Sequence, residues 1–358
     1  MINLLIISYF WGGVCSISIL KGVQDTMWKY MQCAVRGRGH ERTNTPCQDK
    51  TYIFDAYHTR VIALADGAGS AKLSHYGAEC VSENICRLLA QNFDIFYDSD
   101  NAFMVKKDIL SNALIKLEKL ASNLGCILQE LASTLLFAAI KQNKFILGHI
   151  GDGVIGYSKN GIVKVASCPH NGEFANMTTF VTSASAIKDF RLFKGTLDDG
   201  IDGFVLMSDG TETSFYDKKK QSLSTALASI MDLLRVTSPR ETEQKVNVFF
   251  HEVIRKNTLD DCSIIVFVNN HDLTFPNISS KAKLKLFGIS NGDVYANRRI
   301  RKYQGILCEL KKPKTMNELR KVIHMREKIL RKCIHHLMDI NLVECHQGRY
   351  VSVLEYGE

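Results

Sequence analysis

Three apolar segments of this chain each end at an Asp-Gly pair. The runs 61–65, 145–150 and 204–207 have the length and composition of buried β-strands. Glycine lets the backbone turn sharply at the end of a strand, so each aspartate is expected at the rim of a sheet. One such pair is usually only a turn, but three in one chain favour a shared site. The pairs are Asp66-Gly67, Asp152-Gly153 and Asp209-Gly210.

A fourth acidic pair, Asp260-Asp261, precedes the strand-like run 263–268. Antiparallel neighbours bring the start of one strand beside the end of another, so these carboxylates are expected near the other three. Two unit charges about 4 Å apart repel by roughly 4 kcal/mol at an effective dielectric of 20, and a bound divalent cation would compensate for this. Acids without a His/Cys cluster predict magnesium or manganese rather than zinc.

The composition is that of an ordinary globular protein with room for one large and one small domain. The chain has 358 residues, of which 46% are hydrophobic and 23% charged. Its eleven cysteines are scattered, with no CxxC pair and no zinc-site spacing. This cysteine usage favours a reduced, cytoplasmic setting.

Residues 1–27 form an apolar N-terminal extension, and residues 1–20 carry no charge. Three interpretations stay open: a loosely attached extension or an artefact of the assigned start, with Met27 or Met31 opening the domain; a membrane anchor; or a secretory signal. The first Lys, Lys21, follows the apolar stretch, which suits an anchor with a cytoplasmic domain better than a secretory signal. Membrane contact is expected only if residues 1–20 are a real anchor.

Residues 28–272 predict an α+β domain in which antiparallel sheets are covered by helices. Helical periodicity covers 74–93, 105–120, 223–234 and 241–255, whereas 134–166 shows four strand-like runs joined by short polar connections. Long helices beside sequential hairpins exclude a doubly wound parallel sheet.

The C-terminal part is predicted as a linker at 273–300 and a basic module at 301–358. Residues 281–358 hold 17 Lys or Arg and 8 Asp or Glu, a net charge of +9, which leaves −1 for the rest of the net +8. Helices at 305–310, 316–322 and 327–340, then a hairpin at 342–353, resemble a winged-helix module. Its partner is expected to be a protein or, as the second alternative, a nucleic acid. The basic residues that face phosphates in that alternative, or otherwise solvent, are Arg326, Lys328, Arg331 and Lys332.

The order of the short motifs resembles that of the metal-dependent protein phosphatases of the 2C type, in a bacterial branch, over roughly residues 30–268. The motifs are CQD at 47–49, ALADGAG at 63–69, Ser133-Thr134, GDG at 151–153, SDG at 208–210 and DDCS at 260–263. The resemblance implies a four-layer α/β/β/α sandwich of two antiparallel sheets. It also implies metal-dependent hydrolysis of phosphoserine and phosphothreonine in protein substrates.

The same resemblance implies the ligands of two Mn2+ or Mg2+ ions and of a third, weaker ion. Asp66 would bridge two ions, and the Gly67 carbonyl would contact one of them. Asp209 and Asp260 would hold the first ion, Asp49 would support the second, and Asp152 would belong to the third. Asp261 replaces the usual Asn of the family, a change expected to keep a hydrogen-bonding role.

Two departures from the family concern the phosphate and the proton. The usual Arg before the acidic pair is Asn44, and Arg42 or Arg38 is close enough in sequence to replace it. A His that follows the bridging Asp-Gly in eukaryotic members is Ala68 here. His40 is the candidate proton donor, with a structural loop His as the alternative.

These departures leave two other classes of function open. A pseudophosphatase would bind phosphorylated partners without turnover, and a regulator would bind DNA through the basic module. The polar segment 170–183 is either a flap over the site or a solvated connection.

Overall fold

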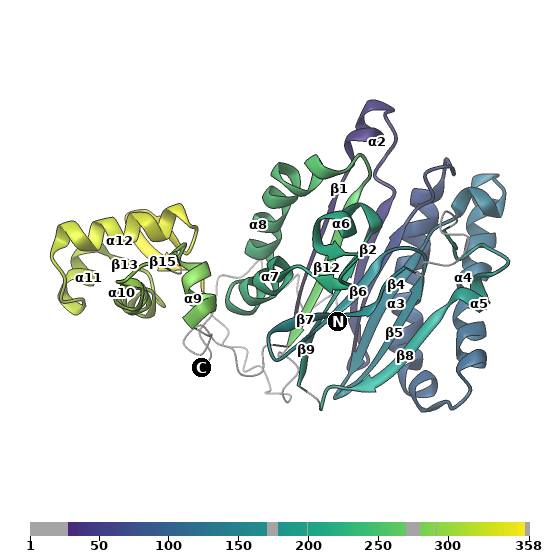
Figure 1. Cartoon of the computed structure of the whole chain (residues 1–358), viewed down its shortest axis with the longest axis horizontal. Helices are drawn as coiled ribbons and strands as arrows, with labels where there is room; N and C mark the ends of the chain where they lie inside the picture. The colour runs from purple at the N-terminus through teal and green to yellow at the C-terminus, as the bar shows by residue number, and fades with distance from the viewer. Residues whose placement is uncertain (1–27, 170–177, 199, 270–279, 291, 355–358) are drawn as a thin grey trace, which may run out of the picture.

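The fold is described from a computed structural model that covers residues 28–169, 178–198, 200–269, 280–290 and 292–354 (Figure 1). The extension predicted at 1–27 lies outside the described residues. So do residues 170–177 of the predicted flap.

The first sheet has five antiparallel strands. Their spatial order is β1 (Trp28–Val35), β12 (Cys262–Asn269), β9 (Ile201–Met207), β6 (Val154–Lys159) and β7 (Ile162–Ser167). β1 and β12, the first and last strands of the sandwich, are thus paired along their whole length, which brings distant parts of the sequence side by side at one edge of the sheet.

The second sheet also has five antiparallel strands. Their order is β2 (Asp49–Ala56), β3 (Thr59–Asp66), β4 (Leu135–Lys141), β5 (Lys144–Ile150) and β8 (Arg191–Thr196). The hairpins β2–β3 and β4–β5 turn at residues with positive φ, namely Tyr57, His58 and Gln142.

The two sheets pack face to face, and helices cover their outer faces (Figure 1). Alternate residues of β3 and β4 meet alternate residues of β9 and β12 in the middle core, including Leu64, Phe204 and Phe267. The helices α3 (Ser74–Asp98) and α4 (Ala102–Leu124) bury their apolar faces against the second sheet. The helices α7 (Thr225–Val236) and α8 (Pro239–Glu252) do the same on the first sheet. The predicted α/β/β/α sandwich is therefore confirmed.

Local sequence explains where α7 and α8 begin. Ser224 and Ser238 cap the two helices, because their hydroxyls accept the N–H of Ala226 and Glu241. Pro239 occupies the first turn of α8, where its missing N–H costs nothing.

The remaining short elements of the sandwich are α2 (Arg38–Arg42), η1 (Leu128–Leu131), α5 (Ala186–Asp189), α6 (Asp209–Phe215), β10 (Tyr216–Asp217), β11 (Ser222–Leu223) and η2 (Ile254–Asn257).

The C-terminal region has a core of its own, which also takes in Val236 from the end of α7. Its elements are α9 (Ser280–Leu286), α10 (Ala296–Glu309), β13 (Lys314–Thr315), α11 (Met316–Val322), α12 (Glu327–Asp339), β14 (Val343–His346) and β15 (Arg349–Ser352). The three strands form a sheet in the order β13-β15-β14.

This region differs from the sequence prediction in its first part. The helix predicted at 305–310 begins nine residues earlier, as α10. The helix α9 lies within the range 273–300 that was predicted as a linker, and Phe287 and Ile289 of that range are buried in the C-terminal core. Among the helices described, none has both the length and the apolar character needed to cross a membrane.

Candidate metal centre

The hairpin β2–β3 supplies the first two carboxylates. Asp49 opens β2 and Asp66 closes β3, and the antiparallel register places them directly opposite each other. Thr134 fixes the backbone of Asp66 from both sides: its hydroxyl accepts the Asp66 N–H at 2.9 Å, and its own N–H donates to the Asp66 carbonyl at 2.8 Å. The Ser133-Thr134 motif thus holds one aspartate at the rim of the second sheet.

The first sheet supplies Asp209 and the pair Asp260-Asp261. Asp209 opens α6 directly after β9, and the two later aspartates precede β12, the neighbour of β9. Ser208 joins the two segments, because its N–H donates to the Ser263 carbonyl and its hydroxyl accepts the Ser263 N–H. The start of β12 therefore lies beside the end of β9, as the sequence predicts.

Asp152 lies in the connection between β5 and β6, where a glycine is required. Gly151 has a φ of +114°, a conformation that other residues rarely adopt. The buried His149 contacts the Gly151 carbonyl through Nε2 at 3.0 Å, and its Nδ1 lies 2.8 Å from the Ser167 hydroxyl. These contacts fix the loop from which the Asp152 side chain projects.

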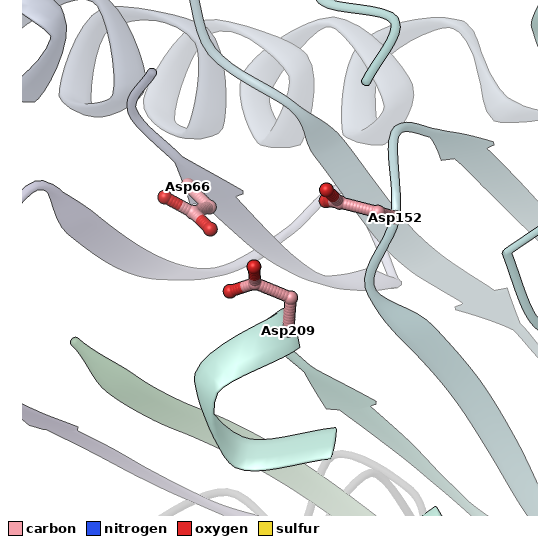
Figure 2. A group of neighbouring side chains, drawn as sticks. All are labelled: Asp66, Asp152 and Asp209. Atoms are coloured by element: carbon pink, nitrogen blue, oxygen red, sulfur yellow. The ribbon is translucent and has the colours of Figure 1, made fainter. Parts of the chain in front are cut away.

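Three of these carboxylates converge (Figure 2). Asp66, Asp152 and Asp209 come from a strand end, a loop and a helix start, and their side chains point toward one another. Each offers a carboxylate oxygen, and these atoms all lie within 4.8 Å of one another. Asp260 is exposed and is not one of these three residues. Asp49 is buried and is not one of them either.

Burial and the charges of neighbouring acids raise the pKa of Asp66 and of Asp209. Burial raises the pKa of Asp66 well above its usual value, and the charges of Asp49, Asp209, Asp260 and Asp152 add to the effect. The pKa of Asp209 rises to about 6, first through burial and then through Asp152 and Asp260. All five aspartates therefore contribute to one electrostatic centre.

Asp49 is the most strongly buried member, with 2% of its surface exposed. Burial, followed by the charge of Asp261, raises its pKa to about 8. Both of its carboxylate oxygens are buried, with the hydroxyls of Ser208 and Ser263 close enough to lower its pKa, and one buried oxygen of Asp209 has no hydrogen-bond donor among the residues described. Buried carboxylate oxygens without donors are costly unless a cation contacts them, so this donor set fits a hard divalent ion.

Asp261 has a different environment from the other five aspartates. One of its oxygens accepts the N–H of Gly37 and the other that of Gln48, each at 2.6 Å. His40, on α2, places its Nδ1 2.9 Å from the first of these oxygens. Asp261 thus joins the loop after β1, the start of β2 and the start of β12, and it keeps the hydrogen-bonding role predicted for this position.

Comparison with known proteins agrees with this arrangement. The family model described as "Protein phosphatase 2C" matches residues 36–250, more than half of the chain. The chain belongs to the protein phosphatase 2C family. It is accordingly a protein serine/threonine phosphatase with an acidic cluster suited to metal binding.

Individual relatives are distant. Serine/threonine-protein phosphatase 3 of Escherichia coli (strain K12) is 24% identical over 230 residues, which cover 58% of this chain and 87% of that protein. A bacterial serine phosphatase of known crystal structure has a TM-score of 0.50 and 15% identity, covering 69% of this chain and 99% of that one. The Streptococcal "S. agalactiae serine/threonine phosphatase" has a TM-score of 0.46 and 18% identity, covering 68% and 99%. The crystal structure with the TM-score of 0.50 supports the sandwich fold.

Three arginines lie on α2 or just before it in this phosphatase, and they differ in what they contact. Arg42 is exposed at the end of α2, and no hydrogen bond or ion pair joins it to the described part of the chain. The guanidinium of Arg38 donates to the carbonyls of Lys256 and Thr258. The guanidinium of Arg36 donates to the His40 carbonyl at 2.9 Å, and its buried Nε has no acceptor within the described ranges. Sequence reasoning did not single out Arg36, because it lies before the recognisable motifs.

Ala68 and Thr178 mark the edge of the phosphatase site. Ala68 is buried with Ala71 and Ala132, and the partly buried Phe180 packs against them. The hydroxyl of Thr178 donates to Asp152 at 2.5 Å. The described end of the segment 170–183 therefore contacts the acidic cluster directly.

A buried acid and an exposed base next to the cluster were also missed. Glu212 lies three residues after Asp209 on α6, is 2% exposed, and forms an ion pair with Lys218 at 2.9 Å. Lys218 reaches Glu212 from the turn that follows β10, so the pairing depends on tertiary structure. Its charge acts on Asp209 and Asp152 as well.

Proposed function

We propose that this phosphatase hydrolyses phosphoserine and phosphothreonine in proteins with two or three Mn2+ or Mg2+ ions held by the acidic cluster. The convergence of Asp66, Asp152 and Asp209 carries this proposal. Three acids from separate segments lie within 4.8 Å of one another, and the raised pKa values of Asp66 and Asp209 support a compensating cation.

Each acid has a proposed place in this centre. Asp66 and the Gly67 carbonyl would help to hold two ions, and Asp209 with Asp260 would complete the site of one of them. Asp49 supports the second ion. Asp152 serves the third ion, and its position within the group of Asp66 and Asp209 supports a direct contact. Two adjacent divalent ions would lower the pKa of water and offset the charge on phosphoryl oxygens.

His40 and the arginines of the first loop are proposed to act on the substrate. With Nδ1 of His40 beside Asp261, its Nε2 is suited to give a proton to the leaving serine or threonine oxygen. Arg42 is proposed to bind the phosphate from its exposed position. Arg36 is an additional candidate, because its Nε is buried without an acceptor in the described residues.

A phosphothreonine peptide assay tests the proposal. The purified full chain should release phosphate with Mn2+, and a chelator should stop the reaction. Asp209→Asn and Asp66→Asn should each lower kcat/KM at least about a hundredfold, since each removes a charge and a ligand of the centre. Asp108→Asn is the matched control, because Asp108 is exposed on α4, away from the acidic cluster.

Calorimetric titration with Mn2+ separates the remaining outcomes. Metal binding that Asp209→Asn weakens, without turnover of any phosphopeptide, would indicate a binding protein that recognises phosphorylated partners. Activity that survives both active-site substitutions would contradict the proposed centre. A reduced, cytoplasmic setting is part of the proposal, and the ten cysteines in the described residues are free thiols, which supports it.

A further inference from the structure

The positive charge of this phosphatase is concentrated in its C-terminal region. Residues 281–358 have a net charge of +9, against −1 for residues 1–280. Most acids of the described part of this region already pair with a base. The pairs are Asp293–Arg299, Glu309–Lys314, Glu318–Arg349, Glu327 with both Arg320 and Arg331, and Glu344–His346.

Four of the exposed cations that form no ion pair within the described ranges lie on or beside the neighbouring helices α11 and α12, whereas others, such as Arg298 and Arg301, lie on α10. Lys321 lies in the last turn of α11, Arg326 directly precedes α12, and Lys328 and Lys332 lie on α12. All four are exposed, and within the described ranges none of them forms an ion pair. We call these four residues the basic face.

The geometry of α12 directs this face outward. Its buried side packs into the C-terminal core through Leu330, Cys333, Ile334 and Leu337. At about 100° per residue, Lys328 and Lys332 lie on the opposite side of the helix, one turn apart, with the exposed His335 beside them. The side of α12 that faces away from the core is therefore positively charged in its N-terminal half.

The surrounding elements have the order of a helix-turn-helix followed by a wing. A capping box at Thr315 and Glu318 starts α11, residues 323–326 form the turn, and α12 follows. The hairpin β14–β15 turns at Gln347 and Gly348, both with positive φ. In helix-turn-helix proteins the second helix enters the major groove of DNA with its N-terminal residues toward the bases.

We propose that the basic face binds double-stranded DNA, with α12 in the major groove and the four cations on the phosphate backbone. A helix with side chains is about 10–12 Å across, and the major groove of B-DNA is about 12 Å wide. Lysines are depleted from the centre of protein–protein interfaces, whereas arginine and aromatic residues are enriched there. Three of the four cations here are lysines. The large apolar side chains exposed nearby are those of Val322, with 47% of its surface exposed, and Ile329, with 40% exposed.

Fluorescence anisotropy of a labelled 20-base-pair duplex with the full chain tests this proposal. Binding is expected at about 50 mM salt, and log K should fall with log salt with a slope of about −3 to −4, for roughly four phosphate contacts. The double substitution Lys328→Glu and Lys332→Glu should weaken binding at least about tenfold, because it reverses two of the four charges.

The control variant changes the net charge of the protein by the same amount, but on the helix α4. Lys107 and Lys119 are exposed on α4, and Lys107→Glu with Lys119→Glu should change the affinity less than twofold. Phosphopeptide hydrolysis by both double variants should match the wild type, which shows that the catalytic domain is folded and keeps this test independent of the proposed reaction. Lys328→Ala with Lys332→Ala should reduce the salt slope by about 2.

Three results would each overturn the proposal. The first is the absence of duplex binding at 50 mM salt. The second is equal loss of binding in the α12 and α4 variants, which would reduce the effect to net charge. The third is binding of polyglutamate as tight as that of the duplex, which would identify an acidic protein segment as the partner.

Discussion

Asp49 and Asp66 lie directly opposite each other where β2 begins and β3 ends. The two carboxylates stay close enough to repel each other, because both backbones are fixed in one antiparallel ladder. Burial and the neighbouring acids raise the pKa of both, for Asp49 to about 8. The carboxylates at the rim of the sheet therefore repel each other, and a bound cation would reduce this repulsion.

The metal-free protein should therefore lose stability as the pH rises. The folded pKa of Asp49 is about 8 against 3.8 for an ordinary aspartate, so between these values the folded state holds more protons than the unfolded state. The free energy of unfolding then falls with increasing pH across this window and levels off above it. Each pKa unit corresponds to about 1.4 kcal/mol. Urea unfolding of the protein, kept metal-free with a chelator, at several pH values between 5.5 and 8.5 measures how the free energy of unfolding changes.

Two comparisons make this prediction specific. Asp49→Asn should flatten the pH dependence of the metal-free protein, since it removes the titrating group. Mn2+ should stabilise the wild type more at pH 8 than at pH 5.5, because metal binding competes with protons. Stability of the chelated wild type that is constant or rises over this range would contradict the prediction.

Asp261→Asn should destabilise this phosphatase even though the family usually has Asn at this position. The two oxygens of Asp261 accept the N–H groups of Gly37 and Gln48. An amide offers a single oxygen, so its NH2 group would face one of these donors and leave a buried N–H unsatisfied. The expected loss is about 1–3 kcal/mol in urea unfolding, with a lower kcat. Asp108→Asn is again the control, and equal stability of both variants would count against this role.

The sequence predicts the sandwich and the rim position of its acids because the signals are local. A buried strand followed by Asp-Gly places Asp66 and Asp209 without knowledge of their neighbours. The three Asp-Gly pairs predict that Asp152 shares a site with both, but its position depends on the loop at Gly151 and its contact with His149, which the sequence does not show. Asp49 entered through the family resemblance alone, and the strand register explains its position.

Other features escaped prediction because their signals are weak or nonlocal. The first half of α10 buries only Ile300 and Tyr303 among four basic residues, so its apolar pattern is faint. The strand β13 has two residues and is defined by its pairing with β15. The pair Glu212–Lys218 joins α6 to the turn between β10 and β11, which no helical or strand periodicity describes.

Gly210→Ala should disrupt the metal centre through the backbone. A Cβ at residue 210 would lie 2.1 Å from the carbonyl oxygen of Asp261, and backbone atoms cannot move aside cheaply. The substitution should push α6 away from the start of β12 and separate Asp209 from Asp260. Mn2+ affinity is expected to fall about ten- to a hundredfold in calorimetry, as for lost support of metal ligands.

A second glycine gives the matched control. Gly305 lies on the exposed side of α10, and a Cβ there would meet no atom within 4 Å. Gly305→Ala should leave Mn2+ affinity unchanged and should stabilise the protein by about 0.5–1 kcal/mol, because alanine favours the helix. Similar metal affinities for Gly210→Ala and Gly305→Ala would show that the close contact of α6 with Asp261 is not required.

Lys218→Met should strengthen Mn2+ binding rather than weaken it. The Lys218 ammonium is paired with Glu212, and its positive charge also acts on Asp209 and Asp152, so it opposes a second cation nearby. Removing it should raise Mn2+ affinity about two- to tenfold, whereas Glu212→Gln should lower it, because that change removes a negative charge beside the cluster. Lys218 is largely exposed, so the free energy of unfolding should change by less than about 1 kcal/mol. Titration calorimetry at low salt measures the Mn2+ affinity of both variants. If both substitutions changed the Mn2+ affinity in the same direction, packing rather than charge would connect this pair to the metal centre.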